Sequence, residues 1–353
     1  MSGAGDEPSP GRRALRGSSC GSPLGVVAAL LAPLRSRPEA SSAERWMRRA
    51  LRVAAVAAAL LLLVGVPLVV HPQWGVDLAR RVALWRAGAD TGFVEVDGAR
   101  IAWASVGSGR PILVVHGLGA ESAAMMPLAR ALAARGFRAT MIDLPGCGRS
   151  PAGPRPLTID DAGKYAADAA KALGMGDRPT MLGHSLGGWI VAWQALARPA
   201  RTGPIVLVAP AGMLFSPPPV EDLLPTTVAG ARRNLALLFV RPPRVPDFAL
   251  WINVRKDRRG SRDLWRSALT GENLLDGRLG EVKSPALVVA GAQDKIVPPR
   301  TAEAMARGIK DARLLVLPDA GHMLIWERAD AVADAAARFL EERRDAPAAE
   351  ATG

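Results

Sequence analysis

From about residue 92 the chain alternates short apolar runs with longer stretches in which apolar residues recur at helical spacing. Continuous apolar runs are typical of strands buried on both faces, and recurrence every three to four residues is typical of the helices that cover them. The predicted strands are 111–116, 139–144, 180–183, 204–209, 285–291 and 313–317, and the predicted helices are 122–135, 158–173, 186–197, 300–308 and 327–343. This alternation predicts an α/β fold with a mostly parallel sheet and right-handed crossovers.

Two segments depart from this rhythm. Residues 93–104 alternate apolar and polar positions on either side of Asp97-Gly98, which predicts a hairpin. Residues 213–280 are rich first in proline and then in arginine and tryptophan. We interpret this stretch as a helical cap inserted over the sheet, so the predicted core covers 90–212 and 281–344.

The N-terminal part has a different composition. Residues 1–46 are rich in Gly, Ser, Pro, Ala and Arg without an apolar period, which predicts a disordered basic segment. An uncharged run then extends from Val53 to Val70, and about 17–25 residues are needed to span a bilayer. We interpret residues 47–71 as a transmembrane anchor. A cleaved signal-like segment is the alternative, although no Ala-x-Ala site ends the run, and a buried core helix is a weaker one.

The arginines before the apolar run indicate its orientation. They are closer to the run than the arginines after it, which favours a cytoplasmic N-terminus and a periplasmic or extracellular remainder. Met47 is a second candidate start, because the residues before it show no structural pattern.

The formal net charge of +12 does not by itself indicate nucleic-acid binding. The arginines are spread among Ala, Gly and Pro without a basic stripe interleaved with aromatic residues. A basic surface near anionic lipid, or a compositional bias toward arginine, explains the charge better. Cys20 and Cys147 lie in unrelated settings, and the four histidines form no metal-ligand spacing. We therefore expect no nucleic-acid partner, no metal and no organic cofactor.

The candidate nucleophile is Ser185, in the sequence Gly183-His184-Ser185-Leu186-Gly187. A predicted strand precedes this Gly-x-Ser-x-Gly motif and a predicted helix follows it. That context is typical of a nucleophile elbow, where a sharp turn exposes the serine and small neighbours let the strand and helix approach.

A serine hydroxyl needs a general base within hydrogen-bond reach. His71 ends the apolar run, His184 neighbours the serine and points away from it, and His116 ends a central strand. His322, on the loop after the last strand, is therefore the candidate base. Its expected carboxylate partner is Asp294, just past a strand end, with Asp319 and Asp311 as alternatives.

An oxyanion formed at Ser185 requires two N–H donors. We expect the backbone N–H groups of Leu186 and Leu118, because glycines flank Leu118 and let its loop bend toward the serine. The candidate substrate-binding residues are Gly117, His184, Phe215 and Trp251. The apolar cap residues among them are equally explained by ordinary packing of the cap on the sheet.

Taken together, these residues resemble the α/β-hydrolase superfamily over about residues 92–343. The resemblance rests on His116-Gly117-Leu118-Gly119, Asp143-Leu144-Pro145-Gly146-Cys147-Gly148-Arg149-Ser150, Gly183-His184-Ser185-Leu186-Gly187-Gly188, Gly291-Ala292-Gln293-Asp294 and Gly321-His322. The set looks like the serine esterase and lipase branch, which is monoacylglycerol-lipase-like and in which some members carry an N-terminal membrane anchor. A serine nucleophile argues against the dehalogenases and epoxide hydrolases of that superfamily, which attack with aspartate.

The resemblance implies an α/β-hydrolase fold and hydrolysis of carboxylic esters, lipid-like or of medium chain, through a triad of Ser185, Asp294 and His322. A C–C bond hydrolase, a cofactor-free haloperoxidase-like enzyme and an acyltransferase use the same arrangement and stay open as alternatives. A non-catalytic binding protein is disfavoured by the complete set of nucleophile, acid and base.

Overall fold

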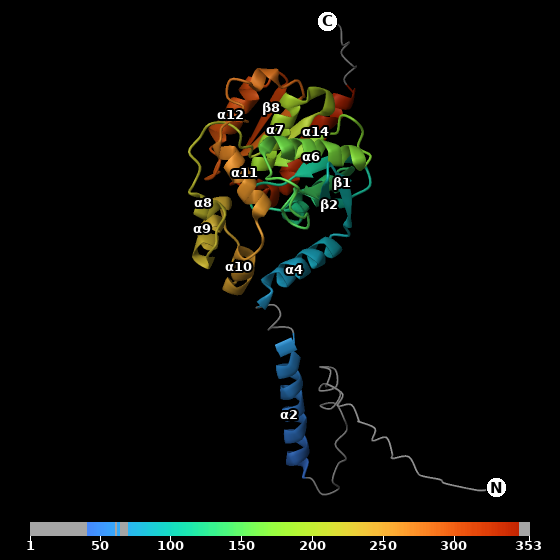
Figure 1. The fold of residues 1–353 in the computed structure, drawn as a ribbon, viewed down its shortest axis with the longest axis vertical. Helices are drawn as coiled ribbons and strands as arrows, with labels where there is room; N and C mark the ends of the chain where they lie inside the picture. Colours follow the sequence, from blue (N-terminus) through green and yellow to red (C-terminus); the bar gives the residue numbers. More distant parts are fainter. Residues whose placement is uncertain (1–40, 61, 64–69, 346–353) are drawn as a thin grey trace, which may run out of the picture. The chain divides into compact units, whose positions relative to one another are not determined.

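The computed structural model describes residues 41–60, 62–63 and 70–345. The chain divides into two compact units, residues 1–63 and 64–353. The second unit contains the whole sheet and the helices that cover it (Figure 1).

The first unit contains helix α2 (Ser42–Leu60). The Ser41 and Glu44 side chains each accept a hydrogen bond from the other residue's backbone N–H, at 3.2 and 3.1 Å. This capping box satisfies free N–H groups at the helix start. The prediction of disorder is therefore wrong for residues 42–46, while residues 1–40 lie outside the described part of the chain.

Within the described residues, no helix combines the length and the apolar character that crossing a membrane requires. The predicted span, residues 47–71, begins inside α2. Residues 61 and 64–69 of that span lie outside the described residues. The anchor therefore stays a prediction.

The second unit is built on one eight-stranded sheet with the order β1-β2-β4-β3-β5-β6-β7-β8. Its strands are β1 (Asp90–Val96), β2 (Ala99–Val106), β3 (Arg110–Val115), β4 (Phe137–Asp143), β5 (Met181–His184), β6 (Ile205–Val208), β7 (Ala286–Gly291) and β8 (Ala312–Leu317). The β1–β2 hairpin and the β2–β4 pair are antiparallel, and all other neighbours are parallel. Asp97 and Gly98 both have positive φ at the hairpin turn. The predicted α/β-hydrolase fold with a mostly parallel sheet is confirmed.

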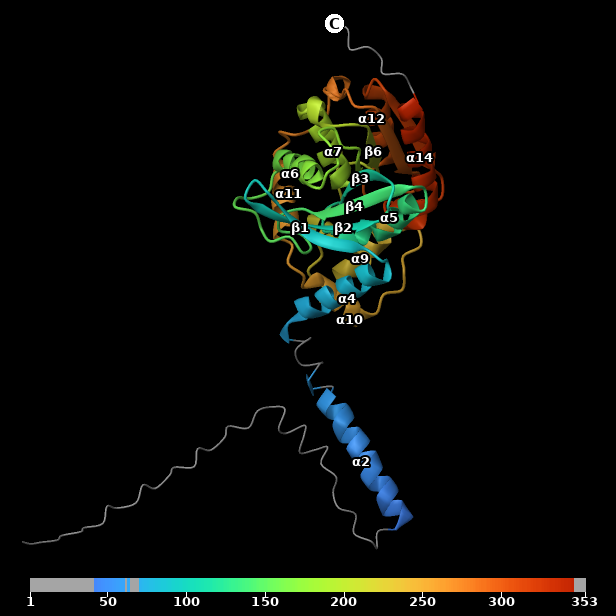
Figure 2. The same ribbon diagram turned by 90° about the vertical axis from the view of Figure 1, so that its right-hand side faces the viewer.

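Helices cover both faces of the sheet. One face carries α5 (Met126–Ala133), α13 (Leu324–Glu327) and α14 (Ala329–Asp345), and the other carries α6 (Ile159–Ala172), α7 (Leu186–Ala197) and α12 (Pro299–Gly308) (Figure 2). Strand β3 shows why both faces need cover. Ile112 and Val114 point into one apolar core, and Leu113 and Val115 point into the other, all fully buried.

The segment between β6 and β7 contains four α-helices, at the place predicted for the cap. They are α8 (Val220–Leu223), α9 (Val228–Leu238), α10 (Asp247–Val254) and α11 (Arg259–Leu269). Helix α4 (Pro72–Arg86), which precedes β1, lies against α10 (Figures 1 and 2). The Gln73 side chain donates to the carbonyl of Arg255 at 2.9 Å, and Arg80 pairs with Glu121 of the core at 2.7 Å. Helix α4 therefore joins the cap to the core.

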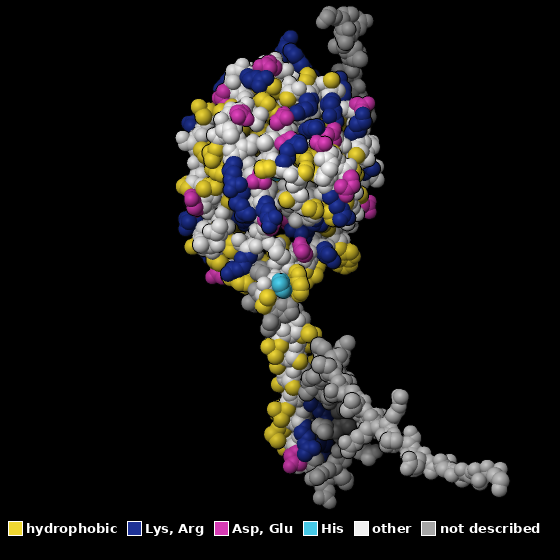
Figure 3. Space-filling view, in the orientation of Figure 1, with side chains coloured by type: hydrophobic (Ala, Val, Ile, Leu, Met, Phe, Trp, Pro, Cys, Tyr) yellow, Lys and Arg dark blue, Asp and Glu magenta, His cyan; other side chains and the backbone are white. Residues whose placement is uncertain are grey.

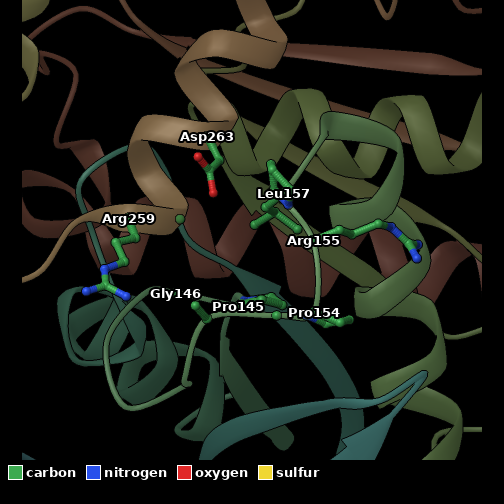
Figure 4. Close-up of a pocket in the computed structure, with 11 residues that line it drawn as sticks. Pro145, Gly146, Pro154, Arg155, Leu157, Arg259 and Asp263 are labelled. Carbon is green, nitrogen blue, oxygen red and sulfur yellow. The ribbon is translucent and has the colours of Figure 1, made fainter.

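The last cap helix is seated on the loop that follows β4. The Gly260 N–H donates to the Gly146 carbonyl at 3.1 Å, and a Cβ on Gly260 would lie 2.2 Å from the carbonyl oxygen of Pro145. Only glycine fits this contact. Beside it is a pocket of about 230 Å³ between the loop and the start of α11, lined by Arg155, Arg259 and others (Figure 4).

Candidate functional site

Ser185 stands at a strained turn between β5 and α7. Its backbone has φ 57° and ψ −122°, a combination that residues other than glycine rarely adopt. The Ser185 N–H donates to the Val208 carbonyl at 2.9 Å, and its carbonyl accepts from the Ala211 N–H at 3.1 Å. These bonds to β6 and the residues after it hold the strained conformation and keep the serine at the carboxyl end of the sheet.

The glycines around Ser185 are required by close backbone contacts. A Cβ on Gly183 would lie 2.1 Å from the carbonyl oxygen of Gly187, and one on Gly187 would lie 2.3 Å from that of Val115. Neither neighbour is a flexible side chain. The start of α7 is therefore packed directly against β3 and β5, where no side chain fits between them.

We expect Gly183→Ala to lower the free energy of unfolding by about 2–3 kcal/mol, because the new methyl group overlaps backbone that cannot move aside. Gly280→Ala is the matched control. A Cβ at Gly280 meets no atom within 4 Å, so its effect should stay within about 0.5 kcal/mol. Urea unfolding of both variants measures the difference, and equal effects would contradict the packing argument.

His322 bridges Ser185 and Asp294. Its Nε2 lies 2.8 Å from Ser185 Oγ, and its Nδ1 lies 2.7 Å from Asp294 Oδ2. The side chains of His322 and Asp294 are 3% and 2% exposed. A proton on Nδ1 is donated to the carboxylate, which leaves Nε2 free to accept the serine proton. The structure therefore brings together the three residues predicted as nucleophile, base and acid.

The surroundings of Asp294 keep it ionised. Burial by itself raises the pKa of Asp294, but His322 and the backbone N–H groups of Val297 and Ile296 outweigh burial and hold the pKa below its usual value. Those N–H groups donate to Oδ1 at 2.9 and 2.8 Å, so Oδ2 is left for the imidazole. The two alternative carboxylates are engaged elsewhere: Asp319 pairs with Arg328, and Asp311 pairs with Arg343.

The predicted oxyanion donors lie on the two segments nearest to Ser185. Leu186 is the first residue of α7. Leu118 lies in the loop after β3, where a Cβ on Gly117 would be 3.0 Å from Ser185 Cβ. Within the described residues, neither leucine N–H donates to a protein acceptor. Both donors are therefore available, as a developing oxyanion requires.

Two contacts that the sequence does not indicate hold the neighbouring loops. In the loop after β3, the Gly119 N–H donates to Ser261 Oγ of cap helix α11 at 3.1 Å. In the His322 loop, the Glu327 carboxylate accepts from the N–H groups of Gly321 and of Val240 in the cap, both at 2.8 Å. The cap thus contacts both sides of the site, through residues whose sequence surroundings carry no recognisable motif.

The other predicted binding residues have different surroundings. His184 is buried, and its Nε2–H donates to the His322 carbonyl at 2.9 Å, so it supports the base from behind. Phe215 is partly buried against the core, and the guanidinium of Arg255 lies 3.8 Å from the centroid of a Trp251 ring. Gly117 lies beside the serine. A role in substrate binding stays a prediction for these residues.

His184 gives the fold a measurable pH dependence. Burial, aided by the nearby His322, lowers the pKa of His184 to about 3, whereas the pKa of an unfolded histidine is about 6.5. Between these values the unfolded chain binds a proton that the folded chain does not, so the free energy of unfolding falls as pH falls from about 6.5 toward 3. His184→Gln retains an N–H donor but has no group that titrates in this range. Between pH 7.5 and pH 5, we expect its free energy of unfolding to fall by about 2 kcal/mol less than that of the wild type.

Urea unfolding at the two pH values measures this difference. His71→Gln changes an exposed histidine and should behave like the wild type. A wild-type pH dependence in His184→Gln would show that another group is responsible.

Known proteins resemble this chain in sequence and in fold. The model of the alpha/beta hydrolase family matches residues 112–335. The chain is 29% identical over 257 residues to the 2-hydroxy-6-oxo-6-phenylhexa-2,4-dienoate hydrolase of Burkholderia cepacia, covering 66% of this chain and 88% of that protein. It is 30% identical over 263 residues to the dihydrolipoyllysine-residue acetyltransferase component of the acetoin cleaving system of Pseudomonas putida, covering 70% and 68%.

Among solved structures, a bacterial membrane phospholipase A superposes with a TM-score of 0.71 at 24% identity, over 86% of this chain and 99% of that one. This likeness concerns the fold. None of these three relatives singles out the monoacylglycerol-lipase-like branch. Together with the family match over most of the chain, they show that the protein belongs to the alpha/beta hydrolase family and is an enzyme with hydrolase activity.

Proposed function

We propose that this enzyme cleaves carboxylic esters through an acyl-enzyme on Ser185. The observation that carries the proposal is the pair of contacts at His322, with Nε2 2.8 Å from Ser185 Oγ and Nδ1 2.7 Å from Asp294. A serine so placed can be deprotonated as it attacks, and the carboxylate stabilises the imidazolium that forms.

The reaction has two halves. Ser185 Oγ attacks the ester carbonyl while its proton passes to His322 Nε2, and the N–H groups of Leu118 and Leu186 stabilise the oxyanion. The C–O bond to the alcohol breaks, and His322 returns the proton to the leaving oxygen. Water then attacks the acyl-enzyme, its proton passes to His322, and the acid leaves as Ser185 regains its proton.

Apolar groups beside the site support a lipid-like or medium-chain acyl group. Leu224 of the cap lies next to the loop after β3, which carries Leu118. One methyl group of Leu224 is 3.1 Å from where a Cβ on Gly119 would be. At the His322 loop, the Leu238 carbonyl accepts from the Met323 N–H at 2.9 Å, and the Leu238 side chain is partly buried against the core. The ends of α8 and α9 thus bring apolar residues to both loops that carry the catalytic groups. Such walls favour an alkyl chain over a polar substituent.

Turnover of p-nitrophenyl esters from acetate to palmitate tests this proposal. We expect a burst of nitrophenol equal to the enzyme concentration, and the highest kcat/KM at medium chain length. A flat profile would contradict the assignment of the acyl group, and the absence of ester turnover would contradict ester hydrolysis itself.

C–C bond hydrolysis is the second candidate, and the relative from Burkholderia cepacia favours it, since its name specifies a dienoate substrate. The same serine and histidine would act, but the bond broken would join the acyl carbon to carbon. The assay is the disappearance of the coloured 2-hydroxy-6-oxo-6-phenylhexa-2,4-dienoate. Turnover of this substrate without turnover of any ester would decide for the second candidate.

We also propose that the apolar run 53–70 anchors the chain in a membrane, with the N-terminus in the cytoplasm and the catalytic unit on the periplasmic or extracellular side. The support is the uncharged run itself and the arginines just before it. Carbonate extraction of membranes and protease treatment of spheroplasts, in which the outer face of the cytoplasmic membrane is open to the medium, test the proposal. Release by carbonate, or protection of the catalytic unit from protease in spheroplasts, would contradict it.

A further inference from the structure

A second pocket lies between α4, the start of the sheet and the loop after β4. Its volume is about 670 Å³, within the range of about 300–1,000 Å³ that is typical of small-molecule sites. Basic and apolar side chains make up most of its lining, namely Arg80, Arg81, Arg149, Leu84, Trp85 and Phe93, and Asp77, which pairs with Arg80, is the carboxylate among the lining residues. None of the predicted catalytic residues lines it.

Arg80 is the most buried of the three arginines, at 7% exposed. Its terminal nitrogens pair with Asp77 at 2.6 Å and with Glu121 at 2.7 Å. Its Nε is buried and has no hydrogen-bond acceptor within the described residues. An unsatisfied buried donor of this kind is rare in native proteins. The two carboxylates therefore balance the charge of Arg80, and one of its N–H donors is still left without an acceptor within the described residues.

Arg149 likewise has a buried Nε without a hydrogen-bond partner within the described residues. It donates from a terminal nitrogen to the Trp103 carbonyl, and its Nε lies 3.5 Å from Asp143 without forming a hydrogen bond. The Asp143 carboxylate is fully buried and already accepts the N–H groups of Ser122 at 2.6 Å and Arg149 at 3.1 Å. Asp143 is thus buried outside the lining of the pocket, whereas Arg149 is part of that lining.

Arg81 lies on the exposed rim of the pocket, and within the described residues no hydrogen bond or ion pair engages its side chain. A guanidinium presents planar pairs of N–H donors that match a carboxylate or a phosphate. Arg81 and Arg149 therefore bring two guanidinium groups to the lining of the same pocket.

The remainder of the lining is apolar. Leu84 is buried, whereas Phe93 is exposed and Trp85 is 78% exposed. Trp85 also ends an exposed apolar stripe on α4 that begins at Trp74 and continues through Leu78 and Val82. In Figure 3, hydrophobic and basic side chains lie side by side over the part of the surface that Figure 1 assigns to α4. Large exposed apolar residues beside a basic pocket indicate a ligand with both characters.

We propose that this pocket binds an anionic amphiphile, with its carboxylate or phosphate head on Arg81 and Arg149 and its alkyl chain against Trp85, Phe93 and Leu84. The site is independent of the triad and does not rest on the proposed ester hydrolysis. The shared chemistry fits a free fatty acid and the head group of an anionic lipid.

Isothermal titration of the full-length protein tests the proposal, with dodecanoate and dodecyl phosphate below their micelle concentrations and neutral dodecyl maltoside as the comparison ligand. We expect both anions to bind and the neutral amphiphile to bind at least tenfold more weakly, because the guanidinium contacts supply much of the affinity. Arg81→Gln should raise the Kd for the anions about tenfold, since one charge-assisted contact is lost.

Arg86→Gln is the matched control. Arg86 is an exposed arginine on the same helix that does not line the pocket, and its substitution should change the Kd less than twofold. Equal effects of the two substitutions, or equal binding of the neutral amphiphile, would overturn the proposal.

Vesicles of phosphatidylcholine with and without phosphatidylglycerol distinguish a free fatty acid from the head group of an anionic lipid as the ligand. Arg81-dependent binding that requires phosphatidylglycerol in vesicles, without binding of the monomeric anions, supports a bilayer head group. Arg81-dependent binding of monomeric dodecanoate supports a free acid. Absence of Arg81-dependent binding in both arms overturns the proposal.

Discussion

Replacing Ser185 by alanine is expected to lower kcat for ester hydrolysis by about 10⁵- to 10⁶-fold, because its hydroxyl is the group placed beside the base to form the acyl-enzyme. In the folded enzyme the Ser185 hydroxyl is the group that meets His322 Nε2, at 2.8 Å. Without it, the base can only activate water directly. Hydrolysis of p-nitrophenyl butyrate, together with covalent labelling by a fluorophosphonate, measures the loss.

Ser122→Ala is the matched control for this experiment. Ser122 is fully buried just after the loop that follows β3, and within the described residues its Oγ has no hydrogen-bond partner. Removing that hydroxyl should leave kcat within about twofold of the wild type, because the group forms no contact that is lost. Fluorophosphonate labelling that persists in Ser185→Ala would identify a different nucleophile.

Asp294→Asn is expected to lower kcat by about 10⁴-fold while leaving the fold intact. The amide oxygen can still accept from the Ile296 and Val297 N–H groups. The amide nitrogen then faces His322 Nδ1, where the carboxylate oxygen lay at 2.7 Å. Because an amide N–H needs an acceptor, the imidazole proton moves to Nε2, and the base can no longer take the serine proton.

The rate of fluorophosphonate labelling should fall together with kcat, since both depend on the same proton transfer. Asp319→Asn is the control, because Asp319 is the carboxylate nearest to His322 in sequence and pairs with Arg328 on the surface. Its kcat should stay within twofold of the wild type. A larger loss of kcat in Asp319→Asn than in Asp294→Asn would show that Asp319, and not Asp294, is the carboxylate that supports His322.

The choice between the two carboxylates illustrates what spacing alone leaves open. Asp319 is three residues from His322, and Asp294 is 28 residues away. The position of Asp294 after a strand end favoured it, because parallel strands present their carboxyl ends at one edge of the sheet. The structure places Asp294 Oδ2 on the imidazole because two backbone N–H groups already hold the other oxygen, and no pattern in the sequence indicates those bonds.

The roles of other residues could be identified only from the folded structure. Glu327 has no recognisable motif around it, yet it links the His322 loop to the cap. His184 was a candidate for substrate binding because it neighbours the nucleophile, whereas its ring is buried and bonded to the His322 carbonyl. Arg149 falls within a family-like motif, but its position beside Arg81 in a second pocket depends on how α4 packs on the sheet.

The sequence by itself determined the order of strands and helices, the elbow at Ser185 and the identity of the general base. Each of these depends on apolar periodicity or on neighbours a few residues apart, which the chain carries locally. Tertiary structure alone decided the contacts across the cap, the support behind His322 and the basic pocket under α4. Their partners are brought together across long stretches of chain by packing of the whole unit, and such contacts leave no periodic or local trace in the sequence.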